Sequence, residues 1–152
     1  MILDGNLLLD TAAAITSSAA STNIIDLANA RDMGIGDGDG ETPKVLCLVT
    51  TTFTTTNSAT LQVIFEGSTD GTTWDQYAES TAYAAAALVA GNRLLDIDVP
   101  RPGAGQKIPR YLRLYYTVGT GVFSAGAVTS AIVLGRHDNP VPGYPSGFTV
   151  SN

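Results

Sequence analysis

The sequence predicts an all-β protein, an antiparallel β-sandwich of the jelly-roll type with extended N- and C-terminal arms. Several segments alternate apolar and polar residues with the period of a pleated strand, and residues 61–68 are the clearest of them. These segments recur at spacings of roughly ten to fifteen residues, which is typical of β-sandwiches. No long segment has the 3.6-residue period of an amphipathic helix, so helices are not expected to form a layer.

The clearest predicted feature is a hairpin that joins residues 61–68 to residues 74–80. Leu61, Val63 and Phe65 occupy one face of the first strand, as expected for a strand packed on a core. Asp70-Gly71 lies between the two segments, and this dipeptide favours a tight turn because glycine adopts positive φ without steric cost. A β-hairpin is therefore predicted here.

Other segments are assigned by the same reasoning. Residues 44–53 are apolar on both faces, as in a central strand, and are flanked by β-branched threonines. Further strands are predicted at residues 22–26, 93–99, 110–118 and 127–134. Residues 119–126 are predicted to be a turn region, and the alanine-rich residues 82–90 fit a helical turn or an extended segment equally well. Residues 12–22 fit either a loop or a short helix.

The predicted organisation has three parts. Residues 1–30 form an N-terminal arm and linker, residues 31–138 form the sandwich, and residues 139–152 form a proline-rich tail. The first ten residues are rich in large apolar side chains that have no obvious place in the predicted core. We expect these side chains to contact neighbouring subunits: Ile2, Leu3, Leu7, Leu8 and Leu9.

The amino-acid composition disfavours some classes of binding partner. The net charge of −6 disfavours binding to a phosphate backbone, so no nucleic-acid partner is expected. The longest apolar run, residues 82–90, is too short to span a bilayer, so no membrane partner is expected. Charged residues make up only 14% of the chain, below the usual quarter, which suggests that partners cover part of the surface.

Few residues suggest catalysis. His137 is the only histidine and Cys47 the only cysteine, so one chain cannot build a zinc site from several such ligands. A histidine in a loop is usually solvated, and a cysteine in an apolar strand is usually an inert buried thiol. Asp96 and Asp98 share one strand face and are candidates for an acid–base pair, although such residues usually only solvate a sheet.

Two further groups are candidate binding sites. Asp37, Asp39 and Glu41 alternate with glycines and could wrap a hard cation such as Ca²⁺, although the pattern departs from an EF-hand and also fits a solvated loop. The aromatic residues of two predicted strands could form a platform for sugars: Trp74, Tyr77, Tyr111 and Tyr115. A tryptophan beside a turn more often fills the core, and we expect that role for Trp74.

Six segments of the chain carry a resemblance to a known family: Met1 to Asp4, Ala19 to Asp26, Ala30 to Gly34, Leu61 to Trp74, Arg110 to Tyr116 and Val128 to Leu134. With these segments, the chain resembles the Bbp16-like capsid cement proteins of tailed bacteriophages. The similarity extends over almost the full length, and the N-terminal segment is its most specific part.

This resemblance implies a homotrimeric jelly-roll subunit on the outer capsid surface of the virion. There it would clamp neighbouring major capsid proteins. The residues and the resemblance both favour a structural binding protein with no enzymatic activity and no cofactor. The alternatives are a carbohydrate- or receptor-binding jelly roll, which requires Trp74 and Tyr115 on an exposed face, and a hydrolase that uses Asp96 and Asp98.

Overall fold

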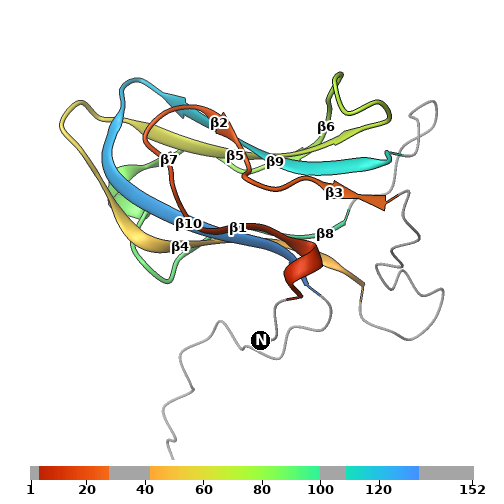
Figure 1. Cartoon of the computed structure of the whole chain (residues 1–152). Coiled ribbons are helices and arrows are strands. Elements are labelled where there is room, and N and C mark those ends of the chain that lie inside the picture. The colour runs from red at the N-terminus through yellow and green to blue at the C-terminus, as the bar shows by residue number, and fades with distance from the viewer. Residues whose placement is uncertain (1–3, 28–41, 100–108, 134–152) are drawn as a thin grey trace, which may run out of the picture.

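The structure is a computed structural model of the 152-residue chain, and it describes residues 4–27, 42–99 and 109–133 (Figure 1). The described residues form a β-sandwich of two antiparallel sheets and two short 3₁₀ helices. The strands are β1 (Leu8–Ala14), β2 (Ala19–Ala20), β3 (Ile25–Asp26), β4 (Lys44–Thr55), β5 (Thr60–Ser68), β6 (Asp75–Glu79), β7 (Tyr83–Ala84), β8 (Arg93–Asp98), β9 (Tyr111–Gly119) and β10 (Phe123–Val133).

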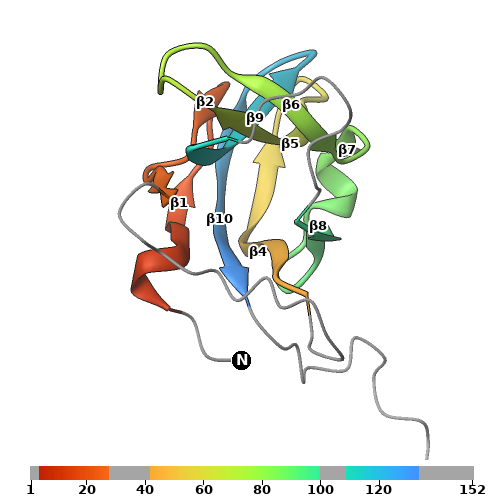
Figure 2. The same cartoon turned by 90° about the vertical axis from the view of Figure 1, so that its right-hand side faces the viewer.

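Each sheet combines strands from distant parts of the chain. Sheet A has the order β1-β10-β4-β8, and Figure 2 shows these four strands side by side. Sheet B has the order β2-β9-β5-β6, with β3 also paired to β9 and β7 also paired to β5. Figure 1 shows sheet B as the upper layer and sheet A as the lower layer. The expected all-β sandwich is confirmed, and its layers fit a jelly roll.

The core lies between the two sheets and is built by alternating side chains. In β5, Leu61, Val63 and Phe65 are buried, whereas the residues between them are only partly so. Phe53 of β4 and Phe123 of β10 meet edge to face, with ring centroids 4.9 Å apart. This contact joins neighbouring strands of sheet A and buries large apolar areas in the core.

The predicted hairpin and most predicted strands are confirmed. β5 and β6 pair antiparallel, and Gly71 in the connection has φ +76°. The final strand is longer than predicted, because β10 already begins at Phe123 and the preceding turn is correspondingly short. Residues 82–90 contain both expected forms, since β7 is followed by the 3₁₀ helix η3 (Ala85–Ala87).

The predicted N-terminal arm is wrong for residues 4–27. They form a 3₁₀ helix, η1 (Gly5–Leu7), and then β1, β2 and β3, all of which belong to the sandwich. Strand β1 pairs with β10, and residues 12–22 contain strand rather than helix. The linker boundary at residue 30 and the start of the tail at residue 139 lie outside the described residues.

The leucines predicted to form an interface do not lie on one common surface. Leu7 and Leu9 are 8% and 0% exposed and pack in the main core, so they are not available to a neighbouring subunit. Leu8 points to the other face of sheet A and packs against a small cluster formed by Leu46, Ala131 and Val133. The burial of Leu9 reflects the pairing of β1 with β10, which the local sequence does not reveal. Ile2 and Leu3 lie outside the described residues.

A buried polar cluster ties β1 to both sheets. The Asp10 carboxyl group is 1% exposed and accepts hydrogen bonds from the Tyr116 hydroxyl (2.6 Å) and the Ser130 hydroxyl (2.9 Å). Its other oxygen accepts the Thr22 backbone N–H (2.8 Å). Because Tyr116 belongs to sheet B and Ser130 to sheet A, this cluster links the two layers through their core.

Candidate functional site

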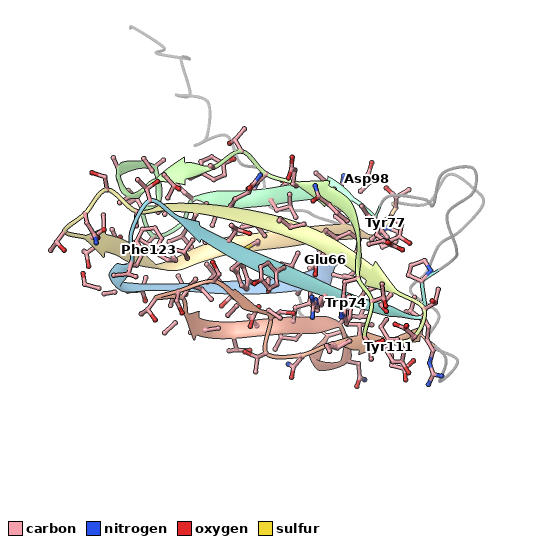
Figure 3. All side chains as sticks on the ribbon, turned by 90° about the horizontal axis from the view of Figure 1, so that it is seen from above. Glu66, Trp74, Tyr77, Asp98, Tyr111 and Phe123 are labelled. Atoms are coloured by element: carbon pink, nitrogen blue, oxygen red, sulfur yellow. The ribbon has the colours of Figure 1, made fainter. Side chains whose placement is uncertain are left out.

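The outer side of sheet B carries a cluster of aromatic and charged side chains. Leu112, Leu114 and Tyr116 of β9 point into the core, so Tyr111, Arg113 and Tyr115 between them project to the opposite side. The paired strand β5 presents Ile64 beside Tyr115 and Glu66 beside Arg113. Figure 3 looks down on this sheet and shows Glu66, Trp74 and Tyr111 near one end of it. We call Ile64, Glu66, Trp74, Tyr111, Arg113 and Tyr115 the aromatic face.

Arg113 is at the centre of the aromatic face. Its guanidinium carbon lies 3.8 Å from the centroid of the Trp74 ring and 5.6 Å from that of Tyr115. Both separations are within the range of cation–π attraction. Its Nε donates a 2.7 Å hydrogen bond to the Glu66 carboxylate. One guanidinium therefore holds two rings and a carboxylate in fixed positions.

The ion pair between Arg113 and Glu66 is largely shielded from water. The two side chains are only 18% and 15% exposed, although they lie on the outer side of a sheet. An ion pair with so little exposure is screened less by salt than a solvated one. A preformed arrangement of this kind loses little conformational entropy when a partner covers it.

A second guanidinium pair lies next to the aromatic face. Arg110 donates from Nε and Nη2 to the two carboxylate oxygens of Asp26, both at 2.9 Å, and its guanidinium carbon lies 4.8 Å from the Tyr111 ring centroid. Donating these hydrogen bonds to the Asp26 carboxylate raises the pKa of Arg110 above its ordinary value. Because bidentate pairs hold both partners in one orientation, Tyr111 has a fixed neighbour.

The β5–β6 connection positions Trp74. Asp70 Oδ1 accepts the backbone N–H groups of Thr72 and Thr73, both at 2.8 Å, and the Ser68 hydroxyl accepts the Gly71 N–H. The two threonine N–H groups hold the pKa of Asp70 well below its usual range. The Asp70 carboxylate therefore stabilises the turn, and this fixes the position of Trp74 immediately before β6.

The predicted aromatic platform is only partly assembled. Tyr111 and Tyr115 lie on the aromatic face, and so does Trp74, which is half-buried there and absent from the core clusters. The expected core role of Trp74 is therefore wrong. Tyr77 does not join the platform, because it packs against the core beside Gly67 and Phe65. Arg113 and Glu66, which organise the face, were not singled out by the sequence reasoning.

The candidate catalytic residues Asp96 and Asp98 are both exposed on β8 and bind different partners. Asp98 accepts hydrogen bonds from Lys44 and Thr42, which hold its pKa below the ordinary value, whereas Asp96 pairs with Arg93. A lowered pKa is the opposite of what a general acid needs. The two aspartates therefore have separate cationic partners.

Cys47 has the expected character of a buried thiol. It lies in β4 inside the main core and is 0% exposed. Burial raises the pKa of Cys47 to about 12, which strongly disfavours the reactive thiolate. The expected inert thiol is thus confirmed by its surroundings.

The remaining candidates cannot be placed. Asp37, Asp39, Glu41 and His137 lie outside the described residues. Within residues 4–27, 42–99 and 109–133, no three His, Cys, Asp or Glu side chains are grouped so that they could hold a metal ion. The same residues contain no helix long and apolar enough to cross a bilayer.

Comparison with known proteins places the chain in a family. A search of the curated proteins found no match. A family model described as Bbp16 matches residues 9–132, which begin in β1 and end in β10 and so include both sheets. Because this match covers most of the chain, the protein belongs to the Bbp16 family.

Proposed function

We propose that this protein is a capsid cement (decoration) protein of a tailed bacteriophage. It binds the outer surface of the capsid shell as a homotrimer and stabilises contacts between neighbouring major capsid proteins. Its partners are other copies of itself and the major capsid protein, and it has no catalytic activity. Membership of the Bbp16 family supports this proposal, because the name points to a phage-associated protein.

The aromatic face is the observation that carries the proposal. Tryptophan, tyrosine and arginine are the side chains that contribute most binding energy in protein interfaces. Here Trp74, Arg113 and Tyr115 are stacked on the outer side of a sheet, and the Glu66 carboxylate completes the group. Such a rigid surface fits recognition of another protein better than chemical transformation of a substrate.

The proposal predicts a specific loss of shell binding. We expect Trp74→Ala to weaken binding to shells of the phage's major capsid protein about 30-fold, since hot-spot truncations cost roughly 2 kcal/mol. Co-sedimentation of purified protein with shells, over a range of protein concentrations, measures this change. Thr50→Ala, at an exposed position of sheet A, is the matched control and should bind like the unaltered protein.

The same experiment can contradict the proposal. Unaltered protein that stays in the supernatant at every concentration would refute shell binding. Equal sedimentation of Trp74→Ala and the unaltered protein would instead show that shells are bound through another surface. A thermal unfolding curve for each variant separates loss of binding from loss of the fold.

A carbohydrate-binding or receptor-binding jelly roll is the second candidate. The observation that favours it is the location of Trp74, Tyr111 and Tyr115 on the outer side of one sheet, where aromatic rings could stack on sugars. Arg113, however, already lies over the Trp74 ring, with 3.8 Å between the guanidinium carbon and the ring centroid. A glycan array distinguishes the cement protein from the carbohydrate-binding protein. A cement protein should give no specific signal, whereas a carbohydrate-binding protein should give one.

A further inference from the structure

The charged residues are distributed unevenly along the chain. Residues 11–25, 45–65, 80–92 and 114–133 contain no Asp, Glu, Lys or Arg. These four segments come from different parts of the sequence, yet each contributes to the same end of the sandwich. They include the β1–β2, β4–β5 and β9–β10 connections and η3. Figure 1 shows the β4–β5 and β9–β10 connections together at the left end of the molecule.

Hydrogen bonds join these segments into one continuous surface. The Thr55 hydroxyl donates to the Val122 carbonyl (2.9 Å), and the Phe123 N–H donates to the Thr16 carbonyl (3.2 Å). On the other side, the Ala90 N–H donates to the Thr52 hydroxyl (3.0 Å). We call residues 16–18, 52–57, 84–90 and 119–124 the uncharged end.

Most ion pairs of the described residues lie toward the opposite end. Each basic side chain that the structure describes is paired with a carboxylate, and three of these pairs lie toward that end: Lys44 with Asp98, Arg110 with Asp26 and Arg113 with Glu66. The fourth pair, Arg93 with Asp96, lies further along β8, where Arg93 is opposite Leu48 of β4. Figure 3 shows Phe123 toward one end of the sandwich and Glu66, Trp74 and Tyr111 toward the other. The described residues next to the undescribed segments, such as Leu27, also lie away from the uncharged end, because β3 pairs with the beginning of β9.

The uncharged end has the properties of a surface that another protein can bury. Val89 and Val122 are large apolar side chains that are 46% and 56% exposed. Several hydroxyl groups around them already have partners within the chain, as in the 2.8 Å hydrogen bond between the Thr54 and Ser124 hydroxyls. Covering such groups costs less than covering hydroxyls that depend on water for their hydrogen bonds. Interface centres are likewise depleted in charge.

We infer that the uncharged end is the surface through which copies of this chain associate. Each copy carries a net charge of −6. Two copies that meet through the end opposite the uncharged end would therefore bring like charges together. Contact through the uncharged ends keeps those charges far apart and buries the exposed valines. This inference rests on the self-association in the proposed function, and it assigns self-association and shell binding to different surfaces.

Charge insertion tests the inference. Val89→Glu/Val122→Glu places two carboxylates at the uncharged end of every copy, at exposed positions whose side chains make no hydrogen bonds. Thr69→Glu/Gln76→Glu is the matched control, because it adds the same charge at exposed positions around the β5–β6 connection. Analytical ultracentrifugation over a range of concentrations measures the association of each protein.

We expect the valine variant to associate at least tenfold more weakly than the unaltered protein, while the control associates normally. The loss should be smaller in 0.5 M salt, since salt screens the introduced repulsion. A neutral pair, Val89→Ser/Val122→Ser, should also associate more weakly but without this salt dependence. Thermal unfolding verifies that each variant is folded.

Two results would overturn the inference. One would leave the proposed self-association intact, and the other would refute it as well. Unchanged association of Val89→Glu/Val122→Glu would show that the copies meet elsewhere, and the proposed trimer would survive. An unaltered protein that stays monomeric at every concentration would remove self-association altogether. Shell co-sedimentation would then decide separately whether the uncharged end or the aromatic face binds the capsid protein.

Discussion

Replacing Gly126 by alanine should destabilise the sandwich by about 3 kcal/mol or more. Gly126 has φ +144°, a backbone conformation that residues with a side chain rarely adopt. A Cβ atom at this position would also overlap the ring of Phe53, which packs in the core against Phe123. Urea-induced unfolding followed by circular dichroism measures the change in the free energy of unfolding.

Gly5→Ala is the matched control for this substitution. Gly5 lies in η1, and nothing lies within 4 Å of the position that a Cβ atom would occupy. Its free energy of unfolding should change by less than about 0.5 kcal/mol. If Gly126→Ala unfolds at the same urea concentration as Gly5→Ala, the close packing of β10 against Phe53 is wrong.

Asp10→Ala should cost about 3 kcal/mol of stability. The substitution leaves the part-buried Thr22 N–H without its acceptor and deprives the buried Tyr116 and Ser130 hydroxyls of a common acceptor. Each buried donor without a partner costs about 1–3 kcal/mol. The same urea titration measures the loss, and Thr11→Ala at the exposed neighbouring position should be nearly silent.

Tyr116→Phe separates the contributions within this cluster. It removes one donor but leaves Asp10 with the Ser130 hydroxyl and the Thr22 N–H, so the expected loss is smaller, about 1 kcal/mol. The double variant should lose less than the sum of the single losses, because the two side chains share one hydrogen bond. Additive losses would contradict a direct contact between Asp10 and Tyr116.

Local features were readable from the sequence. The alternation of residues 61–68 and the Asp70-Gly71 turn both act within a few residues, so the β5–β6 hairpin followed from the sequence alone. Cys47 was predicted to be buried for the same reason, since its neighbours on both sides are apolar. Such features depend on strand period and turn chemistry, which the sequence states directly.

Features that depend on pairing over long distances were missed. The role of Leu9 depends on the pairing of β1 with β10, which lies more than a hundred residues further along the chain. A run of leucines looks the same whether it fills its own core or a neighbour's groove. The register shifts between Leu8 and Asp10 in this pairing also break simple alternation, so both residues 9 and 10 are buried.

The candidate surfaces also arise from pairing. Arg113 and Trp74 are far apart in sequence, and they meet because β9 pairs with β5 in the register that places Arg113 opposite Glu66. The signal available beforehand was weak, namely opposite charges on two predicted strands. The four charge-free segments were visible in the sequence, but their gathering at one end required the sheet order.

A cryo-electron microscopy map of shells mixed with the purified protein tests the central claim most directly. The account predicts added density on the outer surface of the shell, with the sandwich oriented so that the aromatic face contacts the major capsid protein. It also predicts that Trp74→Ala, at the same concentration, gives weak or no added density. Shells that remain bare with the unaltered protein at saturating concentration would contradict the account.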